Sequence, residues 1–210
     1  MASSELRRAI AVAVLVFAGC ATSSSSRGLQ HATLTSTTRA RTTAQELVAA
    51  SDGTVFVFWS GGCPCVRRYQ ARIEALAAEW SVRGIAFVQV SSNAGESIDS
   101  LADVARNRGL KLPLWRDDEG ALAEALDART TPTVVFVARD GRVLYRGWID
   151  NERAPGEDGR EAWLEDALVG FTAGRPFASR TPTWGCTITR SLARSSAPLC
   201  HVVTEEGVTP

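Results

Sequence analysis

The sequence predicts an α/β fold in which a central mixed β-sheet carries helices on both faces, and three observations support this class. Strand-like apolar segments alternate with amphipathic helical segments from residue 42 onward. Residues 54–59 are continuously apolar and β-rich, as expected of a central strand covered on both faces. Asp140-Gly141 separates two apolar runs, which is a strong signal of a two-residue β-hairpin.

The other elements follow from periodicity and from the residues that end each segment. The helix predicted at 66–80 has apolar residues at helical spacing, and Pro64 stands in its first turn, where a missing N–H costs nothing. Gly84 and Gly109 end the helices before them. Residues 54–90 therefore form a strand–helix–strand unit with a right-handed crossover. The expected helices are 44–50, 66–80, 96–108, 121–126 and 162–171, and the expected strands are 54–59, 85–90, 112–115, 133–138 and 142–147.

The N-terminus has the form of a bacterial export signal. Arg7-Arg8 precede an apolar stretch at 9–19 and then Cys20, and this stretch is shorter than the roughly 20 apolar residues of a membrane-spanning helix. Ala18-Gly19-Cys20 resembles the lipobox of bacterial lipoproteins, although Phe17 replaces the usual leucine. We expect acylation of Cys20 and a membrane-anchored protein of the cell envelope. The alternative is an ordinary signal followed by a free or buried cysteine.

Composition divides the rest of the 210-residue chain. Residues 21–41, rich in Ser and Thr, are predicted to be a disordered tether, 42–175 a single domain, and 176–210 an irregular tail that carries Cys186 and Cys200. The 23 Lys and Arg residues balance the 23 Asp and Glu residues, so the charge gives no reason to expect a nucleic-acid partner.

The most informative segment is 55–65, where a buried strand ends in a glycine turn that delivers Cys63 and Cys65 to the start of a helix. Unpaired backbone N–H groups and the helix macrodipole stabilise a thiolate there, so we expect Cys63 to be a solvent-reachable nucleophile. Arg67 and Arg68 either add positive potential or form a solvated helix face. The structural alternative for the pair is a static bridge or two buried thiols.

Residues 58–65 resemble the active-site stretch of the thioredoxin fold, and the wider pattern resembles exported redoxin-domain proteins of the AhpC/TSA (peroxiredoxin-like) family over roughly residues 42–188. The resemblance implies a thioredoxin-like fold, a cis peptide bond before Pro132, and partner docking at Trp59, Thr131 and Pro132. It is carried by Cys63-Pro64, Tyr69, Ser91-Ser92-Asn93, Leu112-Pro113, Thr130-Thr131-Pro132-Thr133, Tyr145-Arg146-Gly147-Trp148-Ile149-Asp150 and Gly185-Cys186-Thr187-Ile188.

The chain departs from that family in two ways. Only Pro64 separates Cys63 from Cys65, and a disulfide in so tight a ring would be strained. The resemblance offers Cys186 as a distant partner, so either Cys65 or Cys186 resolves. Residues 57–62 also lack the Pro and Thr that peroxiredoxins place before the reactive cysteine, and Thr131-Pro132 occupies the place of their arginine.

We therefore expect a thiol–disulfide oxidoreductase that needs no cofactor and acts on protein thiols or disulfides. The alternatives are a peroxidase acting on small hydroperoxides, a copper-binding module of the same fold, and a tethered binding domain with vestigial cysteines. A copper or zinc site would need a further ligand, and the two histidines, His31 and His201, lie in the predicted tether and tail. Residues 117–119 are acidic but predict a turn and helix start rather than a metal site.

Overall fold

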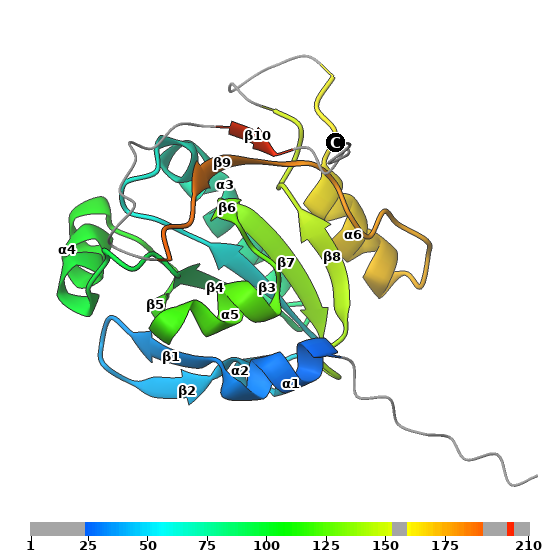
Figure 1. The fold of residues 1–210 in the computed structure, drawn as a ribbon. Coiled ribbons are helices and arrows are strands. Elements are labelled where there is room, and N and C mark those ends of the chain that lie inside the picture. Colours follow the sequence, from blue (N-terminus) through cyan, green and yellow to red (C-terminus); the bar gives the residue numbers. More distant parts are fainter. Residues whose placement is uncertain (1–23, 153–158, 191–200, 204–210) are drawn as a thin grey trace, which may run out of the picture.

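A seven-stranded mixed sheet forms the centre of the protein, as predicted (Figure 1). The structure is a computed structural model that describes residues 24–152, 159–190 and 201–203. Strands β3, β4 and β5 are parallel, and the other pairs are antiparallel. In spatial order the strands are β2 (Arg41–Thr43), β1 (Thr33–Ser36), β5 (Leu114–Asp117), β4 (Ile85–Ser91), β3 (Gly53–Phe58), β7 (Thr133–Ala138) and β8 (Val143–Gly147).

Helices cover both faces of this sheet because its central strands are apolar on both sides. In β3, Val55 and Val57 face one core, while Phe56 and Phe58 face the other. The first core includes residues of α3 (Pro64–Ser81), α4 (Ile98–Arg108) and α6 (Trp163–Thr172). The second includes residues of α1 (Ser24–His31), α2 (Ala44–Ala49) and α5 (Ala121–Ala125). Among the described helices, none combines the length and the apolarity needed to cross a membrane.

A second, three-stranded sheet lies beside the start of α3. It consists of β6 (Thr130–Thr131), β9 (Thr183–Thr187) and β10 (His201–Val203), with β9 in the middle. Thr131 pairs with Cys186 across the antiparallel β6–β9 ladder. The peptide bond between Thr131 and Pro132 is cis, which confirms the expectation from the resemblance.

Local sequence signals explain where most elements begin and end. The hairpin at Asp140-Gly141 is confirmed, as are the glycine ends of α3 and α4, where Gly84 and Gly109 have positive φ. The strand expected at 112–115 begins two residues later, at Leu114, because Pro113 has no N–H for the ladder. The acidic turn is also confirmed: Asp117 accepts the N–H groups of Leu122 and Ala123 at 3.0 Å and so caps α5.

Two composition-based predictions are wrong. Residues 24–36 of the predicted tether form α1 and β1, and β1 joins the sheet through β2 and β5. The Ser and Thr residues there are compatible with a strand, and the few apolar side chains, Leu29 and Leu34 among them, are fully buried. The predicted irregular tail likewise contains β9 and β10. Cys20 and the predicted signal lie outside the described residues.

Because Leu34 is fully buried, its truncation tests whether β1 is packed against the core. Leu34→Ala should lower the free energy of unfolding by about 2–5 kcal/mol, because it leaves a cavity in the core beneath β1. Denaturant unfolding monitored by circular dichroism measures the change. Val82→Ala is the control, since Val82 is 85% exposed and its truncation should change stability by no more than about 0.5 kcal/mol. Equal effects of the two substitutions would contradict a packed β1.

Candidate functional site

The predicted strand–turn–helix that carries the first two cysteines is confirmed. Strand β3 ends at Phe58, Cys63 is the N-cap of α3, and Pro64 is the first residue of the helix. Cys65 follows in the first turn. The site therefore lies at the carboxyl edge of the parallel strands, which is where α/β sheets commonly place functional groups.

Two residues of the 96–108 region hold the turn before Cys63, and no local sequence signal indicates this role. One oxygen of Glu96 accepts the N–H of Gly61 at 2.7 Å and the hydroxyl of Ser60 at 2.9 Å. Arg108 donates to the carbonyl of Gly61 at 2.6 Å, and its guanidinium lies 5.6 Å from the centre of the Trp59 ring. Both contacts span more than thirty residues of sequence, so only the folded chain reveals them.

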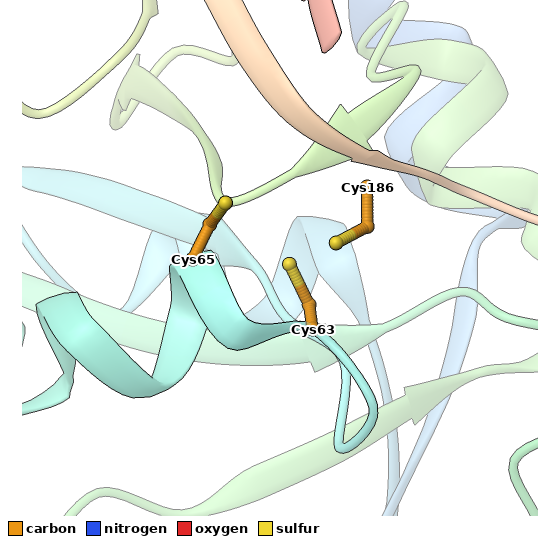
Figure 2. Close-up of side chains that lie close together, drawn as sticks. All are labelled: Cys63, Cys65 and Cys186. Carbon is orange, nitrogen blue, oxygen red and sulfur yellow. The ribbon is translucent and has the colours of Figure 1, made fainter. Parts of the chain in front are cut away.

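The structure brings Cys186 to the same place, as the resemblance implied. Figure 2 shows Cys186 extending from β9 with its sulfur turned toward that of Cys63. The sulfur atoms of Cys63, Cys65 and Cys186 all lie within 4.8 Å of one another. Cys63 also donates a hydrogen bond from Sγ to the carbonyl of Thr131 at 3.2 Å. The site thus combines the start of α3, the loop at the cis-proline, and β9.

The three cysteines are not in the same covalent state. Cys63 and Cys186 are free thiols, whereas Cys65 is disulfide-bonded. The partner of Cys65 therefore lies outside the described residues. A static Cys63–Cys65 bridge, which the sequence left open, is excluded in this state, and so is a disulfide between Cys186 and Cys200.

All three cysteines are buried, which contradicts the expectation that Cys63 is solvent-reachable. The side chains of Cys63, Cys65 and Cys186 are 0%, 2% and 5% exposed. The glycine turn is partly exposed, as predicted, but β9 covers the sulfur atoms because its backbone pairs with Thr131.

The proposed docking residues are covered as well. Trp59 and Thr131 are at most 1% exposed and Pro132 is buried, so they form no open docking surface in this state. The backbone edge of Thr131 is occupied by the protein's own β9. Arg67 and Arg68 are exposed, as expected of a solvated helix face.

Gly185 permits the close approach of β9. Its φ is +134°, and a Cβ atom at this position would lie 2.1 Å from the carbonyl oxygen of Thr131. A side chain here would therefore collide with backbone that cannot move aside as a flexible side chain would. The glycine allows Cys186, the next residue, to reach Cys63.

The electrostatic environment keeps Cys186 protonated. Burial raises the pKa of the Cys186 thiol most strongly, and the hydrogen bond and negative charge of Cys63 also raise it, so that it reaches about 12. A backbone hydrogen bond from Cys65 acts in the opposite direction but is weaker. Cys186 therefore retains its proton at neutral pH.

A buried polar cluster fixes α3 to the segment after β8. Tyr69 donates to Asp150 at 2.6 Å and also to the carbonyl of Glu152. Arg72 and Arg160 pair with the fully buried Asp150 carboxylate. Burial and the hydrogen bond to Asp150 raise the pKa of Tyr69, so the phenol stays a donor at physiological pH. This cluster supports the helix that carries Cys65.

Comparison with known proteins agrees with this fold. The sequence profile of the AhpC/TSA family matches residues 29–146, more than half of the chain. The matched region includes Cys63 and Cys65 but ends before Cys186. No sequence among the curated proteins matches the chain.

The fold of this chain is similar to those of solved structures, one of which is described as thioredoxin-like. A hypothetical protein from Sinorhizobium meliloti is 24% identical, with a TM-score of 0.67 over 76% of this chain and 91% of its own. An uncharacterized conserved protein from Geobacillus kaustophilus is 28% identical, with a TM-score of 0.65 over 75% and 87%. An uncharacterized thioredoxin-like protein from Porphyromonas gingivalis is 21% identical, with a TM-score of 0.52 over 70% and 94%.

The raised pKa of Cys186 leads to a testable pH dependence. Cys63→Ser removes the thiolate charge beside Cys186, so the pKa of Cys186 should fall, although burial keeps it above the ordinary value. Each unit of that fall increases the thiolate fraction about tenfold at a pH below the pKa. The measurement is the rate of Cys186 alkylation against pH, followed by mass spectrometry of peptides.

Restricted access slows alkylation at every pH without moving the midpoint of the profile, so burial and ionisation are distinguishable. The denatured protein gives the ordinary thiol profile as a control. A midpoint for Cys186 that is the same in the reduced native and denatured proteins would contradict the assignment.

Proposed function

Because the chain belongs to the AhpC/TSA family, we propose that it is a thiol–disulfide oxidoreductase in which Cys63 is the nucleophile and Cys186 resolves. One observation carries this choice. Cys63 and Cys186 are both free and lie within 4.8 Å of each other, whereas Cys65 is already in a disulfide. The pair that is ready to form a new disulfide is therefore Cys63 and Cys186.

The reaction begins when the Cys63 thiolate attacks one sulfur of a partner disulfide, R–S–S–R′. A Cys63–S–S–R bond forms, and R′S⁻ leaves. Cys186 then gives its proton to R′S⁻ and attacks Sγ of Cys63, which forms the Cys63–Cys186 disulfide and releases RS⁻. RS⁻ takes up the proton that Cys63 lost when it ionised. The partner gains two electrons as a dithiol, and the protein loses two.

The environment of Cys186 sets the order of these steps. The hydrogen bond of Cys63 and, once Cys63 has ionised, its negative charge both oppose ionisation of Cys186. Once Cys63 is in the mixed disulfide, its charge is gone, so less opposes the loss of the Cys186 proton. Formation of the mixed disulfide on Cys63 therefore activates Cys186, the thiol that reacts next.

The contacts of Cys63 favour disulfide exchange over hydroperoxide reduction. Peroxide cleavage needs hydrogen-bond donors that stabilise the developing negative charge on oxygen. The carbonyl of Thr131, which receives the hydrogen bond of the Cys63 thiol, is an acceptor and gives no such help. The residues that peroxiredoxins use for this purpose are also missing from 57–62 and from Thr131-Pro132.

The proposed substrate is a disulfide on an extended peptide segment. Strand β9 presents a cysteine to Cys63 while its backbone pairs with Thr131, so it has the geometry that such a segment would adopt. A protein substrate gains access when β9 separates from β6. We retain export and acylation of Cys20 as parts of the proposal, on the charged and apolar residues at 7–20.

The mechanism is tested by treating the protein, with Cys63 and Cys186 as free thiols, with one equivalent of a peptide disulfide. We expect non-reducing peptide mapping to find a Cys63–Cys186 link, because these are the two free sulfurs in contact. Cys186→Ser should stop at a mixed disulfide on Cys63, whereas Cys63→Ser should not react. Hydrogen peroxide, assayed in parallel, should oxidise the protein more slowly than the peptide disulfide does. A mixed disulfide that accumulates on Cys186 would overturn the assigned roles.

Gly185→Ala tests the role of β9 in controlling access. The added Cβ would meet the Thr131 carbonyl at 2.1 Å and push β9 away, so native-state alkylation of Cys63 should accelerate about tenfold or more, equivalent to about 1.4 kcal/mol in the opening equilibrium. Gly174→Ala is the matched control. It also has positive φ, +61°, but its Cβ would meet nothing within 4 Å. An unchanged Cys63 rate in a folded Gly185→Ala protein would contradict the model of β9 as a cover.

A further inference from the structure

The three cysteines form a group of soft ligands, and the proposed disulfide exchange uses only Cys63 and Cys186. Their sulfur atoms lie within 4.8 Å of one another, and no His, Asp or Glu of the described residues joins the group. Two of the sulfurs come from the start of α3 and the third from β9, so the group converges from two sides (Figure 2). The resemblance offered Cys186 as a disulfide partner of Cys63, and the fold makes it a third sulfur ligand beside Cys63 and Cys65.

We propose that, after reduction of the disulfide at Cys65, the sulfur atoms of Cys63, Cys65 and Cys186 bind one Cu(I) ion in a three-coordinate site. The inference goes beyond the proposed exchange reaction, because Cys65 is a ligand here and has no role in that reaction. It adds a metal-binding state to the same buried cluster.

The spacing of the sulfurs fits a trigonal site. If all three separations were 4.8 Å, the largest value the geometry allows, the centre would lie about 2.8 Å from each sulfur. Thiolate sulfurs bind metals of this size at about 2.3 Å, as in zinc sites. In that limiting arrangement each sulfur would move inward by about 0.5 Å, and sulfurs that start closer together would separate toward the roughly 4.0 Å spacing of a trigonal site.

The number and type of ligands favour Cu(I) over Zn(II). Thiolates are soft ligands that select Cu(I), whereas structural zinc sites are almost always four-coordinate and tetrahedral. Water is poorly placed to act as a fourth ligand, because the three cysteines are at most 5% exposed. His31 is exposed at the end of α1, and α1 packs on the other core. His201, in β10, pairs with Gly185 across the β9–β10 ladder, so His201→Ala is a further control: it should leave the affinity unchanged if the three sulfurs are the only ligands.

The site requires a reductant and releases protons. A dithiol transfers two electrons and two protons to the disulfide at Cys65, which gives two thiols and leaves the reductant as a disulfide. The ion then binds as up to three S–H protons leave, so the affinity rises with pH. A Cys63–Cys186 disulfide would remove two of the three ligands. Copper binding and a completed exchange cycle therefore exclude each other.

Anaerobic titration of the full, dithiol-reduced chain with Cu(I), in competition with a Cu(I) chelator, tests the proposal. We expect one tightly bound ion per chain, and X-ray absorption should find three sulfur neighbours. Cys63→Ser, Cys65→Ser and Cys186→Ser should each weaken binding at least a hundredfold and leave two sulfur neighbours. Circular dichroism of each variant shows whether it remains folded, and the coordination number of the unmodified chain does not depend on any variant.

Cys200→Ser is the matched control, since it removes a cysteine but none of the three ligands. Its binding should be unchanged. Equal loss of affinity in Cys200→Ser and Cys186→Ser, or two sulfur neighbours in the unmodified chain, would overturn the three-sulfur site. Zn(II) that displaces Cu(I) at equal concentration would overturn the choice of metal. No disulfide substrate is present in these measurements, so they are independent of the exchange activity.

Discussion

The pairing of β9 with β6 is the constraint on which the site depends. Thr131 and Cys186 are partners in this short antiparallel ladder, and the ladder holds the Cys186 sulfur beside the start of α3. The same pairing removes Cys63 from water and occupies the backbone edge next to the cis-proline. Position, burial and access of the reactive sulfur are therefore consequences of one backbone interaction, which Gly185 makes possible.

The two sides of the sulfur cluster, α3 and β9, are held by different contacts. On the α3 side, Glu96 and Arg108 fix the turn, and the Tyr69–Asp150 cluster fixes the helix. On the other side, β9 is held by short backbone ladders to β6 and β10 and by hydrogen bonds just beyond its end, among them that of the Thr189 N–H to Asn93. Local opening favours short ladders over a helix that packs in the core. Movement of β9 over a fixed thiol is the simplest route by which a buried Cys63 meets a partner.

Burial gives the sulfur cluster two uses that compete. A dry environment holds the proton on Cys186 until Cys63 has reacted, which orders the steps of disulfide exchange. The same dry environment suits a soft metal ion with only three ligands, because water is not there to add a fourth. Metal binding also requires reduction of the disulfide at Cys65, whereas exchange at Cys63 and Cys186 does not, and a Cys63–Cys186 disulfide closes the metal site.

The sequence by itself determined the α/β class, most element positions, the cis-proline loop and the placement of Cys63 and Cys65 at a helix start. These depend on periodicity, glycine and proline, and a motif of neighbouring residues, all of which are local. Composition predicted no regular structure at residues 24–36 or in β9, but both regions form regular elements, because a few apolar side chains at the right spacing are enough to join a core. The family resemblance offered Cys186 as a partner of Cys63, whereas only the tertiary structure decided that Cys63 is covered and that Glu96 and Arg108 hold the turn. Those facts join residues far apart in the chain, and contacts of that kind are set by how the whole sheet packs.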